Sequence, residues 1–134
     1  PDLGDAQLTL GVLYELEGRA ADAEEAFERA REAIGDDVRY YQGLGQAYQM
    51  IGEYEKGLAA IEKAIAIDPN SAQSYLTRGS IREATEDYAG ALEDFDRAGT
   101  LAQEQGQDAL YVMARTRMAM LMQRGPSIGF PTGP

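Results

Sequence analysis

A 34-residue period runs through most of this chain. Its clearest markers are Gly11, Gly45 and Gly79, and other residue types return around them at the same interval. The matching sets are Tyr41 and Tyr75; Tyr14 and Tyr48; Ala23, Gly57 and Ala91; Phe27, Ile61 and Phe95; and Ala30, Ala64 and Ala98. A period of this length predicts an array of short supersecondary units rather than one closed core. Such arrays usually present a surface rather than a reaction centre.

Apolar residues within each period recur at helical spacing, and turn residues separate the runs. Gly18, Gly35, Gly52 and Pro69 lie where helices are expected to end. The sequence contains no run of alternating β-branched residues, so we expect no strand. The expected helices are Asp5–Glu17, Ala20–Ala33, Val38–Ile51, Tyr54–Ile67, Ala72–Thr85, Tyr88–Gln103 and Gln107–Gln123. The short turns between them predict an all-α fold of antiparallel helix pairs.

The repeated unit resembles the tetratricopeptide repeat, a helix–turn–helix of 34 residues. The middle unit matches best, through Tyr41, Leu44, Gly45, Tyr48, Tyr54, Gly57, Ile61, Ala64 and Pro69. The third unit departs at Arg82 and Gln103, and the first has Gln7 for the aromatic and Gly35 for proline. The resemblance implies a right-handed superhelical solenoid with seven helices. It divides the chain into repeats at 4–37, 38–71 and 72–105, a capping helix at 106–124 and a flexible Gly/Pro tail at 125–134.

Composition narrows the range of functions. Cysteine, histidine and tryptophan are absent, which excludes disulfides and thiolate metal sites and removes the commonest general acid–base group. The chain has 23 acidic and 12 basic residues and a net charge of −11, which disfavours nucleic acid and anionic lipid. No apolar run approaches about 20 residues, so we expect no membrane insertion. We therefore expect a soluble, cytoplasmic protein that is not an enzyme and has no cofactor and no metal.

The resemblance implies a concave groove lined by the first helix of each pair. By register, the groove should expose an apolar strip beside a ladder of amides, with Asp5, Glu15 and Glu83 at neighbouring inner positions. The predicted groove residues are Leu8, Val12, Arg39, Gln42, Gln46, Gln49, Gln73, Leu76, Ser80 and Leu110. Amides pair with peptide N–H and C=O groups, and apolar positions take anchoring side chains. This predicts binding of an extended, mostly neutral peptide of a partner protein, unless these are ordinary solvent-facing residues.

One activity of the family is not expected here. Chaperone-binding members clamp an acidic C-terminal peptide with lysines, asparagines and an arginine. The matching places hold Leu8, Val12, Gly43, Gln73 and Thr77. Because none is cationic or an asparagine, the chain is not expected to be an Hsp70/Hsp90 C-terminal peptide clamp.

Acidic residues gather on two of the second helices. Those helices should face outward, so the pattern predicts a solvated convex surface, with a basic partner or a loose Ca²⁺ site as alternatives. The residues are Asp22, Glu24, Glu25, Glu28 and Glu32, and Glu93, Asp94 and Asp96. Nothing in the sequence indicates burial that would perturb carboxylate pairs for catalysis.

The last helix departs from the acidic character of the repeats. It holds four of the five methionines and more apolar residues than one stripe needs. Capping of the last repeat accounts for part of this surface, and the excess predicts a second contact, either a homodimer or another domain of a larger parent protein. Self-association would use this helix or the open end of the first repeat. The candidate residues are Met113, Met118, Met120, Leu121 and Met122. In the tail, Ile128 and Phe130 either anchor in a neighbouring groove or belong to a plain linker.

Overall fold

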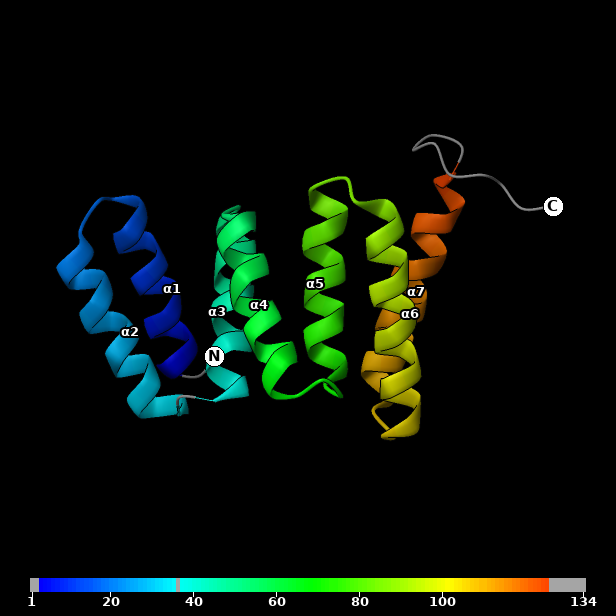
Figure 1. The fold of residues 1–134 in the computed structure, drawn as a ribbon, viewed down its shortest axis with the longest axis horizontal. Coiled ribbons are helices and arrows are strands. Elements are labelled where there is room, and N and C mark those ends of the chain that lie inside the picture. Colours follow the sequence, from blue (N-terminus) through cyan, green and yellow to red (C-terminus); the bar gives the residue numbers. More distant parts are fainter. Residues whose placement is uncertain (1–2, 36, 126–134) are drawn as a thin grey trace. The chain divides into compact units, whose positions relative to one another are not determined.

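The fold, obtained as a computed structural model, is described for residues 3–35 and 37–125. These residues form seven helices and no strand (Figure 1). The helices are α1 (Leu3–Leu16), α2 (Ala20–Ile34), α3 (Val38–Ile51), α4 (Tyr54–Ile67), α5 (Ala72–Ala84), α6 (Tyr88–Glu104) and α7 (Asp108–Gln123). Every predicted helix end lies within two residues of the observed one. The prediction of an all-α fold of antiparallel helix pairs is confirmed.

The chain divides into two compact units. Unit 1 is Pro1–Pro69 and contains α1 to α4, and unit 2 is Asn70–Pro134 and contains α5 to α7. Nine residues of the predicted tail, 126–134, lie outside the described residues, while Gly125 is described and buried.

The repeated glycines let the two helices of a pair approach closely. A Cβ atom on Gly11 would lie 2.5 Å from Cε1 of Phe27, and one on Gly79 would lie 2.7 Å from Cε1 of Phe95. Real Cβ atoms do not approach a ring carbon so closely, so α1 fits against α2, and α5 against α6, only because these positions lack a side chain. In these two helix pairs the 34-residue period marks packing positions.

The core of unit 1 lies between α1, α2, α3 and α4. Its buried members are Leu8, Val12, Ala30, Ile34, Tyr40, Ala47, Tyr48 and Ala60. In unit 2 the core lies between α5, α6 and α7. Its buried members are Leu76, Ala91, Phe95, Ala98, Ala114 and Leu121, with a smaller cluster of Ala72, Leu101 and Ala102. Helix α7 is therefore an integral part of unit 2.

Candidate functional site

A hollow lies between α1 and α3 in unit 1, where the sequence places part of the predicted groove. One part of it has a volume of about 240 Å³ and is lined by Asp5, Ala6, Thr9, Gly43, Gln46, Ala47 and Met50. An adjoining part of about 170 Å³ is lined by Asp5, Ile34, Arg39, Gln42, Gly43 and Gln46. Both parts share Asp5, Gly43 and Gln46, so we treat them as one site, the α1–α3 hollow.

Gly43 explains why this hollow exists and what lies beneath it. A Cβ at Gly43 would lie 2.7 Å from Cδ1 of Leu8 and 3.3 Å from Oδ1 of Asp5. The missing side chain therefore leaves room for Leu8 to pack under α3 and for the Asp5 carboxylate to lie at the surface. The Thr9 hydroxyl donates a 3.0 Å hydrogen bond to the Asp5 carbonyl oxygen, one turn earlier in α1.

Four of the predicted groove residues are buried, and the expectation that they are exposed is wrong. Leu8 and Val12 have no exposed surface because α2 and α3 pack against α1, and both belong to the core of unit 1. Leu76 is 4% exposed and belongs to the core of unit 2. Ser80 is 8% exposed, and its hydroxyl donates a 3.0 Å hydrogen bond to the Leu76 carbonyl oxygen. No exposed apolar strip is formed by these side chains.

The other predicted groove residues divide into two groups. The α1–α3 hollow brings together Arg39, Gln42 and Gln46. Gln49 is half-buried and is not among the residues that line the hollow. In unit 2, the Gln73 amide donates a 3.4 Å hydrogen bond to the Thr77 hydroxyl, and Leu110 packs against the core.

The methionine-rich surface predicted on α7 is smaller than expected. Leu121 is 1% exposed, and Met118 packs against the core of unit 2, so both are internal residues. The exposed apolar side chains are Val112 (60%), Met113 (48%), Met120 (57%) and Met122 (56%). Sequence reasoning named three of these four and missed Val112. An excess of apolar surface on α7 is thus present.

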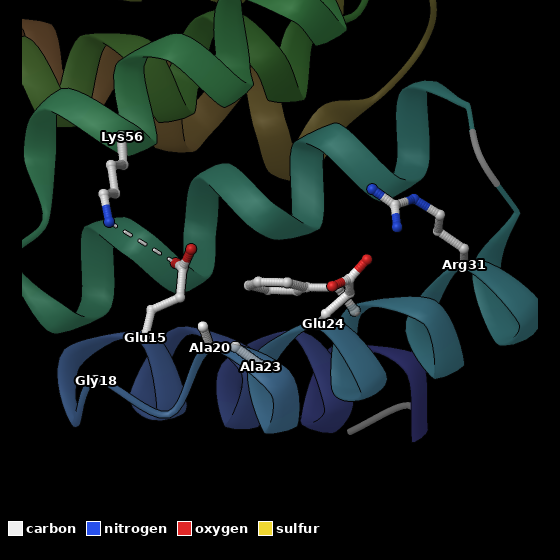
Figure 2. A pocket seen from close by; sticks show the side chains of 8 residues that line it. Glu15, Gly18, Ala20, Ala23, Glu24, Arg31 and Lys56 are labelled. Carbon is white, nitrogen blue, oxygen red and sulfur yellow. Dashed lines mark ion pairs between the residues drawn. The ribbon is translucent and has the colours of Figure 1, made fainter.

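A second hollow lies beside α2 in unit 1 and has a volume of about 410 Å³ (Figure 2). We call it the α2 hollow. It is lined by Glu15, Gly18, Ala20, Ala23, Glu24, Phe27, Arg31 and Lys56. Figure 2 shows Glu15 and Lys56 joined across one end, and Arg31 beyond Glu24 toward the other end. Sequence reasoning did not find this site.

Polar contacts near the α2 hollow hold Glu15 in place. The Tyr48 hydroxyl donates a 2.5 Å hydrogen bond to Oε1 of Glu15, and Nζ of Lys56 lies 4.0 Å from the same oxygen. Burial raises the pKa of Tyr48 above its usual value, and the hydrogen bond to Glu15 raises that pKa further. Both effects disfavour the ionised phenol, because it would be poorly solvated and would face a carboxylate.

A buried ion-pair cluster in unit 2 was also missed. Asp94 is 2% exposed, so its expected place on a solvated acidic surface is wrong. Arg78 forms a two-pronged contact with the Asp94 carboxylate, at 3.0 Å and 2.9 Å, and Arg82 donates to it at 2.9 Å. The two guanidinium groups supply the hydrogen bonds that a buried carboxylate requires. Arg82 was noted only as a departure from the repeat pattern, and its contact with Asp94 explains that departure.

The described residues form neither a membrane span nor a cluster of metal ligands. No helix among them combines the length and apolar character needed to cross a bilayer. No three or more Asp or Glu side chains in residues 3–35 and 37–125 are grouped so that they could hold a metal ion.

Comparison with known proteins identifies the family to which this architecture belongs. Residues 2–70 match the tetratricopeptide repeat family. The chain belongs to that family. It is 34% identical over 106 residues to Protein CTR9 homolog of Arabidopsis thaliana, an alignment that covers 79% of this chain and 9% of that protein. The chain therefore spans less than a tenth of the length of that relative.

Solved tetratricopeptide structures agree with this assignment. PcrH in complex with the chaperone binding region of PopD is 26% identical, with a TM-score of 0.67 over 89% of this chain and 90% of that one. PcrH from Pseudomonas aeruginosa alone is 25% identical, with a TM-score of 0.66 over 88% of this chain and 90% of that one. The fold class is that of an all-α tetratricopeptide solenoid, which is a non-catalytic fold of protein–protein interaction.

Proposed function

We propose that this tetratricopeptide chain is a non-catalytic interaction module that binds an extended peptide segment of a partner protein in the α1–α3 hollow. The observation that carries the proposal is the hollow itself. It gathers Asp5, Thr9, Arg39, Gln42 and Gln46 on one face of unit 1.

The chemistry of the hollow suits a peptide backbone. Side-chain amides offer both a donor and an acceptor, so Gln42 and Gln46 can pair with the N–H and C=O groups of an extended chain. Met50 is 75% exposed at the edge and offers a flexible apolar contact. Because Asp5 and Arg39 contribute opposite charges, the hollow has no strong preference for a charged segment.

The similarity to PcrH supports the same mode of action. That protein was solved with the chaperone binding region of PopD, which is a segment of a partner protein. The absence of a chaperone-peptide clamp stays a prediction, and it agrees with the burial of Leu8, Val12 and Thr77.

Selection from a displayed library of random peptides tests this function. Peptides enriched on the native chain should lose at least about tenfold in affinity when Gln46→Glu adds a second acid beside Asp5, a cost of about 1.4 kcal/mol. Gln103→Glu is the matched control, because Gln103 is exposed on α6 in unit 2. Unchanged binding by both Gln46→Glu and Met50→Glu would show that the selected peptides bind elsewhere.

Self-association is a second candidate function, favoured by the exposed apolar side chains of α7. Met113 and Met120 lie seven residues apart, so they share one face of the helix two turns apart. Removing residues 105–134 would uncover the core against which Ala114 and Leu121 pack, so substitution is the better test. The native chain should dimerise at high concentration, and Met113→Lys/Met120→Lys should be monomeric by light scattering. A native chain that stays monomeric would exclude this function.

A further inference from the structure

Repeat 1 differs from the other repeats at the first residue of its second helix. Helices α4 and α6 begin with Tyr54 and Tyr88, whereas α2 begins with Ala20, which occupies the same place in the 34-residue register. Tyrosine is thus replaced by the smallest side chain that a helix favours.

The packing of Tyr88 shows what this replacement removes. The Tyr88 ring is partly buried and packs against the core cluster that contains Ala91 and Phe95. In repeat 1 the residues in register with those two are Ala23 and Phe27, and both line the α2 hollow beside Ala20. The α2 hollow therefore lies where repeat 1 lacks a tyrosine ring.

The hollow is lined by two acidic and two basic side chains, and both basic side chains already have an acidic partner. Helix α2 contains five acidic residues and two arginines. Lys56 pairs with Glu15, and Arg31 pairs with Glu28 and lies 4.7 Å from the centre of the Tyr40 ring. Glu24 has no ion-pair or hydrogen-bond partner within residues 3–35 and 37–125.

Glu24 also differs in type from the residues at the same position of the other repeats. Its counterparts in the next two repeats are Leu58 and Leu92, both of which are partly buried. Repeat 1 thus has an acid where the others have an apolar residue, four positions after it has lost an aromatic one. Both changes open and polarise the same hollow.

We propose that the α2 hollow is a docking site for an aromatic side chain of a partner protein, a tyrosine or phenylalanine flanked by lysine or arginine. The ring would lie against Ala20 and Ala23 and meet the Phe27 ring, which favours offset or edge-to-face contact. The flanking cation would pair with Glu24. This site shares no residue with the α1–α3 hollow, and it goes beyond the function proposed there.

Aromatic size is favoured over a smaller apolar anchor by the volume of the hollow. Its volume of about 410 Å³ has room for a whole aromatic ring against Ala20 and Ala23. A basic flank is favoured over an acidic one because the chain has a net charge of −11. An acidic partner segment would be repelled from α2.

Three blocked tripeptides test the proposal by NMR titration of the full chain. The probes are acetyl-Lys-Tyr-Lys-amide, acetyl-Lys-Ala-Lys-amide and acetyl-Glu-Tyr-Glu-amide. The first should give saturable shifts at the backbone amides of residues 18–31, and the other two should bind at least about fivefold more weakly. Equal binding of the three probes would overturn the proposal. Shifts centred on Gln46 and Thr9 would also overturn it, because they would assign the peptide to the α1–α3 hollow.

Filling the hollow from within is the matched mutational test. Ala20→Tyr restores the residue found in the other repeats, and it should abolish binding of the Lys-Tyr-Lys probe and raise the melting temperature by roughly 2–4 °C. Ala21→Tyr is the control, because Ala21 is exposed and does not line the hollow. Retained binding in Ala20→Tyr, or a melting temperature below that of Ala21→Tyr, would overturn the proposal.

A second variant tests the electrostatic part of the proposal without changing the packing of the hollow. Glu24→Gln changes only an exposed carboxylate, and it should weaken the Lys-Tyr-Lys probe about threefold or more while leaving the acetyl-Glu-Tyr-Glu-amide affinity unchanged or improved. An unchanged affinity for the Lys-Tyr-Lys probe would remove the electrostatic part of the argument and, with it, the proposed basic partner. Binding of library peptides to the α1–α3 hollow should survive all three substitutions, so the two sites can fail separately.

Discussion

Repeats 2 and 3 place different chemistry at the same three register positions. Repeat 2 has Leu44, Tyr48 and Ala60, and repeat 1 has the same residue types at these positions. Repeat 3 has Arg78, Arg82 and Asp94 instead. In repeat 3 the three side chains contact one another, with the Asp94 carboxylate between two guanidinium groups.

This difference shows that the three positions change together. A lone aspartate in place of Ala60 would bury an unpaired charge, and a lone arginine in place of Leu44 would lack a partner. As a set, the two arginines neutralise and hydrogen-bond the acid, so repeat 3 has a charged cluster where repeat 2 has Leu44, Tyr48 and Ala60. The comparison therefore predicts that substitutions of Arg78, Arg82 and Asp94 have strongly coupled effects on the free energy of unfolding.

The largest expected effect follows removal of the buried acid. Asp94→Ala should reduce the free energy of unfolding by about 2–4 kcal/mol, measured by urea denaturation, because two arginines lose their shared partner. The loss should lie below the upper end of the range for buried pairs, since Arg78 and Arg82 remain 18% and 23% exposed and can reach water. The variant keeps two neighbouring guanidinium groups, of which Arg82 still has an ion pair with Asp87 at 3.7 Å.

Two further variants are needed to interpret the stability of Asp94→Ala. Asp96→Ala on the same helix is the control. Asp96 is 58% exposed and pairs with Arg115 at the surface, so its removal should cost less than about 1 kcal/mol. The triple variant Arg78→Leu/Arg82→Tyr/Asp94→Ala installs the repeat 2 set and should recover most of the stability. A triple variant as unstable as Asp94→Ala would mean that the three positions are not interchangeable as a set.

A smaller effect is expected at Tyr48, which occupies in repeat 2 the position that Arg82 has in repeat 3. The Tyr48 hydroxyl bonds to Glu15 of the preceding repeat, whereas Arg82 bonds within its own repeat. Tyr48→Phe should cost about 1 kcal/mol at pH 7, because one hydrogen bond to a charged group is lost while Glu15 keeps its contact with Lys56. Tyr14→Phe, at the same position in repeat 1, is the control.

The stability difference between the native chain and Tyr48→Phe should change with pH in one direction only. The folded chain raises the pKa of Tyr48, so above the usual tyrosine pKa of about 10 the unfolded chain loses a proton that the folded chain keeps. The contribution of Tyr48 is therefore complete below about pH 10 and declines as the pH rises above it. The stability difference between the native chain and Tyr48→Phe should shrink over that range. A difference that stays constant up to pH 11 would contradict the role of the hydrogen bond.

The period predicted the fold well because packing positions must repeat when helix pairs repeat. Gly11 and Phe27 meet as Gly79 and Phe95 do, so the period together with the helical spacing inside it identified the helices. The register also placed Arg39, Gln42 and Gln46 at one hollow. The register could not predict how deeply each of these side chains is buried. The burial of Leu8, for example, depends on how closely α3 approaches α1 at Gly43.

The missed sites share a cause, since each depends on a departure from the repeat. The sequence pattern predicts only a helix start at Ala20 and a solvated acid at Glu24, and it does not link Arg82 with Asp94. A position-by-position comparison of the three repeats would have found both sets, because Ala20 stands against two tyrosines and Asp94 against two alanines. The contact between Arg82 and Asp94 needed the structure, since the two residues lie twelve apart and on different helices.

The smallest expected effect concerns the turn between the helices of each repeat. Gly18 and Gly52 have φ angles of 75° and 89°, and Glu86, at the same position in repeat 3, has a φ of 67°. A side chain in this left-handed region costs roughly 1–2 kcal/mol, and the greater entropy of unfolded glycine offsets about 0.5–1 kcal/mol of that gain, so Glu86→Gly should stabilise the chain by about 0.5–1 kcal/mol. Glu86→Gln controls for the lost charge and should have little effect on thermal unfolding. The reciprocal Gly52→Gln should destabilise through the backbone alone, since no atom lies within 4 Å of a Cβ built there. If Glu86→Gly melted below Glu86→Gln, repeat 3 would have adapted its turn to glutamate, and the three turns would not be equivalent.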